Sequence, residues 1–226
     1  MVWERLQRAN PAWIVLALLA NFLIMICWTQ QWRALLPGTR PVEWPRMLSI
    51  VGITAVVGNT IPASGQITTV VLLAREPGVT YAAALSVLAL DQLLEAICKT
   101  AIVLFAATLL PLPEDMKHAV FALGIAAAVS LVVLVVFANQ KRYLVRFALE
   151  LESLRNVRRL VVAVVFCLGA KFCEFAAIVA VQHAFGERIS LSITVLVEAA
   201  ILLGTIFPLS PANIGTYEAS VSIVYR

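Results

Sequence analysis

The sequence predicts an all-α, polytopic integral membrane protein in which two broken helices form re-entrant hairpins of inverted orientation. Three observations support this fold class. The 226 residues are 62% hydrophobic and only 13% charged, a composition outside the range of soluble domains. The mean hydropathy is +0.93, and several apolar runs are long enough to cross a bilayer. Two further apolar runs are interrupted by proline, glycine and polar residues, which a plain spanning helix does not accommodate.

The transmembrane helices are expected where apolar runs of about 20 residues or more can cross a hydrocarbon core of roughly 30 Å. In the first run, Trp13, Trp28 and Trp32 are placed where an interfacial aromatic belt would lie. The predicted transmembrane helices are residues 12–36, 81–110, 118–139 and 160–182.

Residues 141–159 form a basic loop between the last two of these helices. The loop carries six Lys or Arg residues against Glu150 and Glu152. By the positive-inside rule, such a loop lies in the cytoplasm. We therefore expect a multi-pass protein of the cell inner (plasma) membrane, with this loop on the cytoplasmic side.

Residues 47–75 form the first predicted re-entrant hairpin. At its centre, Pro62 lacks a backbone N–H, and Gly65 loosens the backbone. The polar side chains of the same stretch offer substitute hydrogen bonds. Non-helical backbone at membrane depth is tolerated only where protein or a water-filled cavity receives its polar groups, so the break predicts a binding site.

Residues 190–226 form the second predicted hairpin, and its break resembles the first. In both, Pro follows Gly by four residues, as Gly58 and Pro62 and again as Gly204 and Pro208. We interpret this as a weak internal repeat. The charges of the flanking loops predict that the two hairpins open from opposite faces, an arrangement in which many transporters build a site near the bilayer midplane.

Charged residues within the apolar segments are the other candidates for a site. Each costs at least about 2.5 to 3.5 kcal/mol near the bilayer centre, so these side chains are expected to face the bundle interior. Asp91, Glu95 and Lys99 share one helix face, and Lys99 can neutralise Glu95. Lys171 and Glu174 can pair in the same way. Counting all candidates gives five acids against two lysines, which suits either a proton-coupled step or a cationic substrate group.

These two sets of residues define the predicted site. The substrate-binding candidates are Asn59, Pro62, Ser64, Gly65, Gln66, Asp91, Glu95, Lys99, Ser210, Asn213, Gly215 and Glu218. The candidates for ion pairing or proton coupling are Lys171, Glu174 and Glu198.

Several classes of protein are not supported by the sequence. It contains no HExxH, G-x-S-x-G or P-loop motif and no Cys/His metal spacing, so we expect neither an enzyme nor a metal or cofactor. The four cysteines lie in apolar segments and are expected to be small buried hydrophobic residues. Most Lys and Arg residues fall in loops that set orientation, so no nucleic-acid partner is expected.

Four stretches, in order along the chain, resemble a known family of bacterial and archaeal membrane proteins. They are ANPAWIVLALL, WRALL, VGNTIPASGQITTVVLLAREPGVTYAAALSVLALDQLLE and FPLSPANIGTYEAS. The family is the lysylphosphatidylglycerol synthase transmembrane, or flippase-like, family. Its members commonly have one helix before the first stretch and more after the last, so this chain is expected to be shortened at both ends.

The resemblance extends to individual site positions. Asn59, Pro62 and Gly65 or Gln66 match the opening of the family's first break, although the acid and Arg that follow there are absent. Asp91 matches an Asp of the family's long helix, where Gln92 replaces an Arg. The second break is matched by Pro211, Gly215 and Glu218, with Tyr217 where Arg is frequent.

The resemblance implies translocation of a lipid between leaflets, or a related role with lipid-linked sugars or hopanoid-type lipids. Our leading hypothesis is a flippase-like transporter for a phospholipid or a polyprenyl or hopanoid-type lipid, with membrane lipid as its partner. One alternative is a non-transporting subunit that recruits a lipid-modifying or glycan-synthesising enzyme through the basic loop. Another is a proton-coupled carrier of a small solute. An oligomer is left open.

Overall fold

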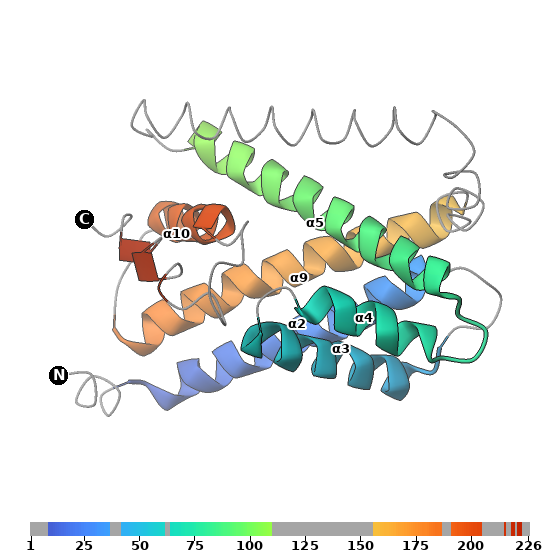
Figure 1. Ribbon diagram of the computed structural model, residues 1–226. Coiled ribbons are helices and arrows are strands. Elements are labelled where there is room, and N and C mark those ends of the chain that lie inside the picture. The colour runs from blue at the N-terminus through green and yellow to red at the C-terminus, as the bar shows by residue number, and fades with distance from the viewer. Residues whose placement is uncertain are drawn as a thin grey trace.

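The computed structural model describes residues 9–36, 42–61, 64–109, 156–186 and 191–204, with residues 215, 218–219 and 221–222. Within these residues the regular structure is helical and contains no strand, so the predicted all-α class is confirmed (Figure 1). The predicted helix at 118–139, nearly all of the basic loop at 141–159 and most of the second half of the 190–226 hairpin lie outside them. The helices are α2 (Pro11–Leu35), α3 (Trp44–Thr60), α4 (Ser64–Ala74), α5 (Tyr81–Leu109), α9 (Val157–Ala184) and α10 (Leu191–Gly204).

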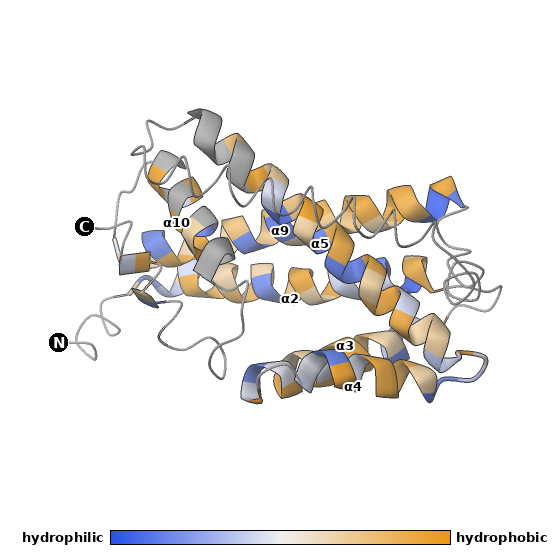
Figure 2. Cartoon of the chain, turned by 45° about the horizontal axis from the view of Figure 1, so that its top comes forward, coloured by the Kyte–Doolittle hydropathy of each residue, from blue (hydrophilic) through white to orange (hydrophobic). Residues whose placement is uncertain are grey.

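Helices α2, α5 and α9 are long and apolar enough to cross a membrane, which confirms a polytopic membrane protein. The 25 residues of α2, for example, rise about 37 Å and exceed a hydrocarbon core of roughly 30 Å. Many large apolar residues of these helices are exposed, and Figure 2 colours the described parts of the three helices largely as hydrophobic. Leu18 of α2 is 66% exposed and Phe172 of α9 is 73% exposed. Such surfaces are stable in contact with lipid tails rather than water.

Helices α2 and α9 form an antiparallel pair that lies side by side along most of its length (Figure 1). At one end the backbone N–H of Asn10 donates to the carbonyl of Ala184 over 2.8 Å. At the other end Arg159 Nη1 donates to the carbonyl of Leu36 over 3.3 Å. Small residues at the interface let the two backbones approach closely, as in other membrane helix pairs. The buried alanines of this pair are Ala17, Ala20, Ala163, Ala170, Ala177, Ala180 and Ala184.

Helices α3 and α4 form a helical hairpin, so the predicted break within residues 47–75 is present as two separate helices (Figure 1). The backbones touch near the tip, where a Cβ atom built on Gly65 would lie 3.2 Å from the Cα of Gly58. The Ser64 hydroxyl, placed at the break, can donate to the carbonyl of Val57 at 2.9 Å or of Ile61 at 2.6 Å. The break is therefore held together by local contacts.

The two ends of the hairpin meet at its base. Arg46 Nε, near the start of α3, lies 2.7 Å from Oε1 of the buried Glu76, just after α4. The 11 residues of α4 rise only about 16 Å, about half of the hydrocarbon thickness. The hairpin thus begins and ends at the same end of the molecule, as a re-entrant element requires. Its placement within the bilayer, and that of a second hairpin, stays a prediction.

Arginine side chains gather at the end of the molecule where the hairpin has its base. There Arg33 Nε donates to the carbonyl of Val42 over 3.0 Å. Val42 is close in sequence to Arg46, and Arg159 contacts Leu36 at this same end. Helix α10 lies toward the opposite end, against α5 and α9 (Figures 1 and 2). This distribution follows the pattern of the positive-inside rule. The side of the membrane on which each end lies stays a prediction.

Candidate functional site

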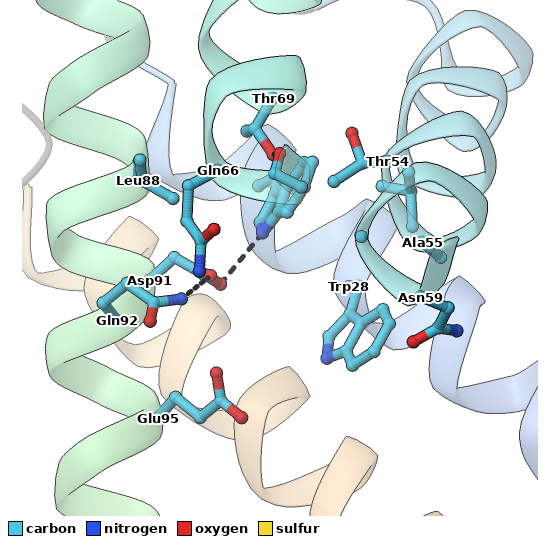
Figure 3. A pocket seen from close by; sticks show the side chains of 14 residues that line it. Trp28, Thr54, Ala55, Asn59, Gln66, Thr69, Leu88, Asp91, Gln92 and Glu95 are labelled. Carbon is cyan, nitrogen blue, oxygen red and sulfur yellow. Dashed lines mark hydrogen bonds between the residues drawn. The ribbon is translucent and has the colours of Figure 1, made fainter. Parts of the chain in front are cut away.

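A cavity of about 260 Å³, lined by both apolar and polar side chains, lies where the tip of the hairpin approaches α2 and α5 (Figure 3). Leu88, Asp91 and Glu95 of α5 are three and four positions apart and project from one face of that helix, with Gln92 next to Asp91. The residues that line the cavity are Trp28 and Trp32 of α2; Val51, Thr54, Ala55, Gly58 and Asn59 of α3; Gly65, Gln66 and Thr69 of α4; and Leu88, Asp91, Gln92 and Glu95 of α5.

The carboxylate of Asp91, in the cavity wall, accepts three hydrogen bonds. Its Oδ1 accepts hydrogen bonds of 2.9 Å from Nε2 of Gln31 and 2.9 Å from Nε1 of Trp32. Its Oδ2 accepts a 3.3 Å bond from Nε2 of Gln92 (Figure 3). The side chain is only 8% exposed, and hydrogen bonds to a charged group are stronger than those between neutral groups. Asp91 therefore fastens α2 to α5 while it borders the cavity.

Glu95, one turn further along α5, belongs to an ion network. Its Oε1 lies 2.8 Å from Nζ of Lys99 and 3.4 Å from Nζ of Lys171. Lys171, which is only 5% exposed, also lies 2.8 Å from Glu174. The expected pairing of Lys99 with Glu95, and of Lys171 with Glu174, is present. The contact from Lys171 to Glu95 was not predicted, and it links α9 to the wall of the cavity.

Thr54 has an unsatisfied polar group beside the cavity. Its Oγ1 is buried and has no hydrogen-bond partner within the described part of the chain, and the same holds for Oε1 of Gln31. A buried polar atom without a partner costs about 1 to 3 kcal/mol, and such atoms often mark a site for water or another polar group. The cavity wall thus carries the amides of Asn59 and Gln66, with an unsatisfied hydroxyl of Thr54 buried beside it.

The structure brings together five of the predicted substrate-binding residues. They are Asn59, Gly65, Gln66, Asp91 and Glu95, from both sides of the first break and from α5. Two others lie just outside the lining: Ser64 closes the break, and Lys99 reaches the cavity wall only through Glu95.

The remaining predicted residues lie elsewhere or outside the described residues. Glu198 is buried on α10. Glu218 is exposed, and its Oε2 accepts a 2.6 Å hydrogen bond from the backbone N–H of Gly215, which adopts a φ of +88°. Glu198, Glu218 and Gly215 do not line the cavity. Pro62, Ser210 and Asn213 are outside the described residues.

Sequence reasoning missed Trp28 and Trp32 as site residues. Both line the cavity, and Trp32 is buried with its indole N–H bonded to Asp91. The assignment of Trp32 to an interfacial aromatic belt is therefore wrong. One signal could have identified the pair, since the two residues are four apart on one helix face. A buried indole N–H also needs an acceptor, which a charged residue of another helix can supply.

The four cysteines are free, and they lie between helices. Cys98 of α5 and Cys167 of α9 are buried with their Sγ atoms 3.3 Å apart, while Cys27 and Cys173 are partly buried. In the part of the chain that the structure describes, no three His, Cys, Asp or Glu side chains converge to hold a metal ion. Here the cysteines serve as packing residues.

Comparison with known proteins gives one match. The family model described as the lysylphosphatidylglycerol synthase TM region matches residues 1–226, the whole chain. No curated protein and no solved structure matches it.

Proposed function

The chain belongs to the lysylphosphatidylglycerol synthase transmembrane family, and we propose that it is a flippase-like transporter that moves the polar head group of a membrane lipid between leaflets. The observation that carries this proposal is the cavity at the tip of the α3–α4 hairpin, where carboxylate and amide side chains converge among apolar ones. Polar side chains are costly inside a membrane bundle and are retained there mainly for function. Transport, rather than catalysis, is the role proposed for them.

The size of the cavity favours a head group over a whole lipid. Pockets that enclose drug-sized ligands measure about 300 to 1,000 Å³, and this cavity of about 260 Å³ is slightly smaller. A compact head group fits such a volume, whereas acyl or isoprenoid chains do not. In the proposed mechanism the head group crosses through this cavity while the tails stay in the surrounding hydrocarbon.

The lining also favours a head group rich in hydrogen-bond donors. Carboxylates are contributed by Asp91 and Glu95, and amides by Asn59, Gln66 and Gln92. Among these described lining residues there is no Lys, Arg or His. Hydroxyl or ammonium groups therefore find acceptors here, and an ammonium can also lie against the indole face of Trp28. A phospholipid or a polyprenyl or hopanoid-type lipid with such a head group is the proposed substrate.

We propose that the protein lies in the cell inner membrane. In this topology the hairpin is re-entrant and the arginine-rich end of the protein faces the cytoplasm. The 190–226 segment is proposed to enter from the other face. This places the hairpin tip inside the bilayer, where an interrupted backbone is tolerated only against protein or a water-filled cavity.

Reconstitution into vesicles tests the proposal. The protein is expected to accelerate the movement of a lipid with a fluorescent head group to the opposite leaflet, measured by chemical quenching of the exposed fluorophore. Asn59→Leu should slow this movement. Asn21→Leu is the matched control, because Asn21 is an exposed asparagine on α2 that does not line the cavity. Equal rates in vesicles with and without protein would contradict the proposal.

The same preparation separates the two alternatives. A non-transporting subunit would leave lipid movement unchanged and would co-purify with a lipid-modifying or glycan-synthesising enzyme. A carrier of small solutes would take up solute in response to a proton gradient without moving lipid.

A further inference from the structure

Glu198 is a buried carboxylate outside the cavity. It lies on α10 and is 4% exposed, and no ion pair joins it to Lys99 or Lys171, which pair with Glu95 and Glu174. Of the helices that the structure describes, α5 and α9 pack against α10. The charged groups they present within electrostatic reach of Glu198 are Glu174 and Lys171 from α9 and Lys99 from α5.

The nearby cations are already paired. Lys99 lies 2.8 Å from Glu95, and Lys171 lies 2.8 Å from Glu174. Two ammonium groups therefore face four carboxylates, which are Glu95, Glu174, Glu198 and Asp91. Asp91 is held by hydrogen bonds from α2, and Glu198 is left without a cation of its own. A buried carboxylate without a cation is unstable, so such a group takes up a proton or a cation.

We propose that Glu198 is a proton-binding site and that its proton is coupled to the cavity through Lys171. This inference rests on the proposed transport function and adds the ion that drives or regulates it. The exchange is a simple protonation, in which the carboxylate gains one proton from the medium to form a neutral carboxyl group and later releases it.

The geometry of Lys171 supplies the coupling. Its Nζ lies between Glu174 at 2.8 Å and Glu95 at 3.4 Å. When Glu198 is ionised, Glu174 and Glu198 together attract Lys171 away from Glu95. When Glu198 is protonated, this attraction weakens and Lys171 moves toward Glu95.

The consequence for the cavity has a definite sign. With Glu198 ionised, the Glu95 carboxylate at the cavity wall is freer to accept hydrogen bonds from a head group. Binding of a donor-rich head group should therefore strengthen as the pH rises through the titration of Glu198. By reciprocity, head-group binding should release a proton from Glu198.

Infrared difference spectroscopy of the purified protein tests the proton site without any transport measurement. The wild-type protein should show a carbonyl stretch from a protonated carboxyl group that disappears on alkalinisation. Glu198→Gln should lack this band. Glu218→Gln should keep it, because Glu218 is exposed and caps its own turn. A band that persists in Glu198→Gln, or that responds to Na⁺ or K⁺ at fixed pH, overturns the proposal.

Glu198→Asp keeps the test decisive if Glu198→Gln does not fold. This variant retains a carboxyl group with a shorter side chain and should shift the frequency of the band, whereas an unshifted band overturns the assignment. The coupling is tested in vesicles, where the pH dependence of lipid movement should be lost in Glu198→Gln and kept in Glu218→Gln. An unchanged pH dependence in Glu198→Gln overturns the coupling.

The two proposals fail separately. A titrating Glu198 band in a protein that moves no lipid rejects the transport function and leaves the proton site. Lipid movement in a protein without that band rejects the proton site at Glu198 and leaves the transport function.

Discussion

The indole Nε1 of Trp32 donates a 2.9 Å hydrogen bond to Oδ1 of Asp91, and this bond joins α2 to α5 beside the cavity. The same oxygen accepts from Gln31 of α2, so two donors of one helix converge on one carboxylate of another. The bond thus belongs to the scaffold as well as to the site. Variants of Asp91 and Trp32 must be assessed for stability before any effect on transport is assigned.

Trp32→Phe should lower the stability of the protein. The substitution removes a hydrogen bond to a charged group, which contributes about 1.5 to 3 kcal/mol, and leaves Asp91 with its remaining donors. Thermal unfolding in detergent would show this as a lower midpoint. Trp28→Phe is the matched control, because Trp28 lines the same cavity without bonding to Asp91, and it should shift the midpoint less. Equal shifts would show that the bond contributes nothing.

Alanine at Gly65 or Gly58 should open the hairpin. A Cβ on Gly65 would lie 3.2 Å from the Cα of Gly58, and one on Gly58 would lie 3.3 Å from the Cα of Gly65, so backbone would have to move. At Gly52 the nearest atom is the flexible Cε of Met25 at 3.4 Å, which makes Gly52→Ala the control. Spin labels on α3 and α4 should report a wider separation in Gly65→Ala but not in Gly52→Ala. Unchanged separations in both would refute this close contact.

Lys171→Met should be strongly destabilising. Removing one partner of a buried ion pair typically costs about 3 to 5 kcal/mol because the remaining charges are left unpaired. Here Glu174 loses its partner and Glu95 loses one of two. Lys99→Met should cost less, since Lys99 is more exposed and, among the residues that the structure describes, forms an ion pair with Glu95 alone. Adding Glu174→Gln to Lys171→Met should restore part of the stability, and no recovery would argue against the pairing.

Oxidation should cross-link α5 to α9. The Sγ atoms of Cys98 and Cys167 are 3.3 Å apart, so a small membrane-permeant oxidant needs little motion to join them. Because Cys27 and Cys173 also lie in contact, the test uses Cys27→Ser, in which intact-mass measurement after alkylation should show two thiols protected. Adding Cys98→Ser to this variant should remove the protection. Protection that survives in the double variant would show that Cys98 and Cys167 are not the reacting pair.

The parts of the fold that depend on local sequence were predictable. Pro62 and its neighbouring glycines mark the break because their effects on the backbone are local. The Lys99–Glu95 and Lys171–Glu174 pairs follow from spacing along one helix. Asn59 and Asp91 were identified as site residues for related reasons, namely a polar break and a charge within an apolar segment.

The parts that depend on which helices pack together were not predictable. Lys171 and Glu95 are 76 residues apart in the chain and meet only because α9 packs against α5. Trp32 similarly meets Asp91 across 59 residues. Periodicity gives the face of a helix on which a residue lies but does not identify the helix opposite. Thr54 belongs to the same class, because its unsatisfied hydroxyl becomes visible only when all its neighbours are placed.

The ion pair between Arg46 and Glu76 has a mechanical consequence. It clamps the base of the hairpin, while the tip, about 16 Å away along α4, carries the cavity-lining amides. The hairpin is thus fixed to itself at one end of the protein by a side-chain ion pair. Neutralising Glu76 should loosen this base and shift the amides at the tip, although Glu76 does not line the cavity.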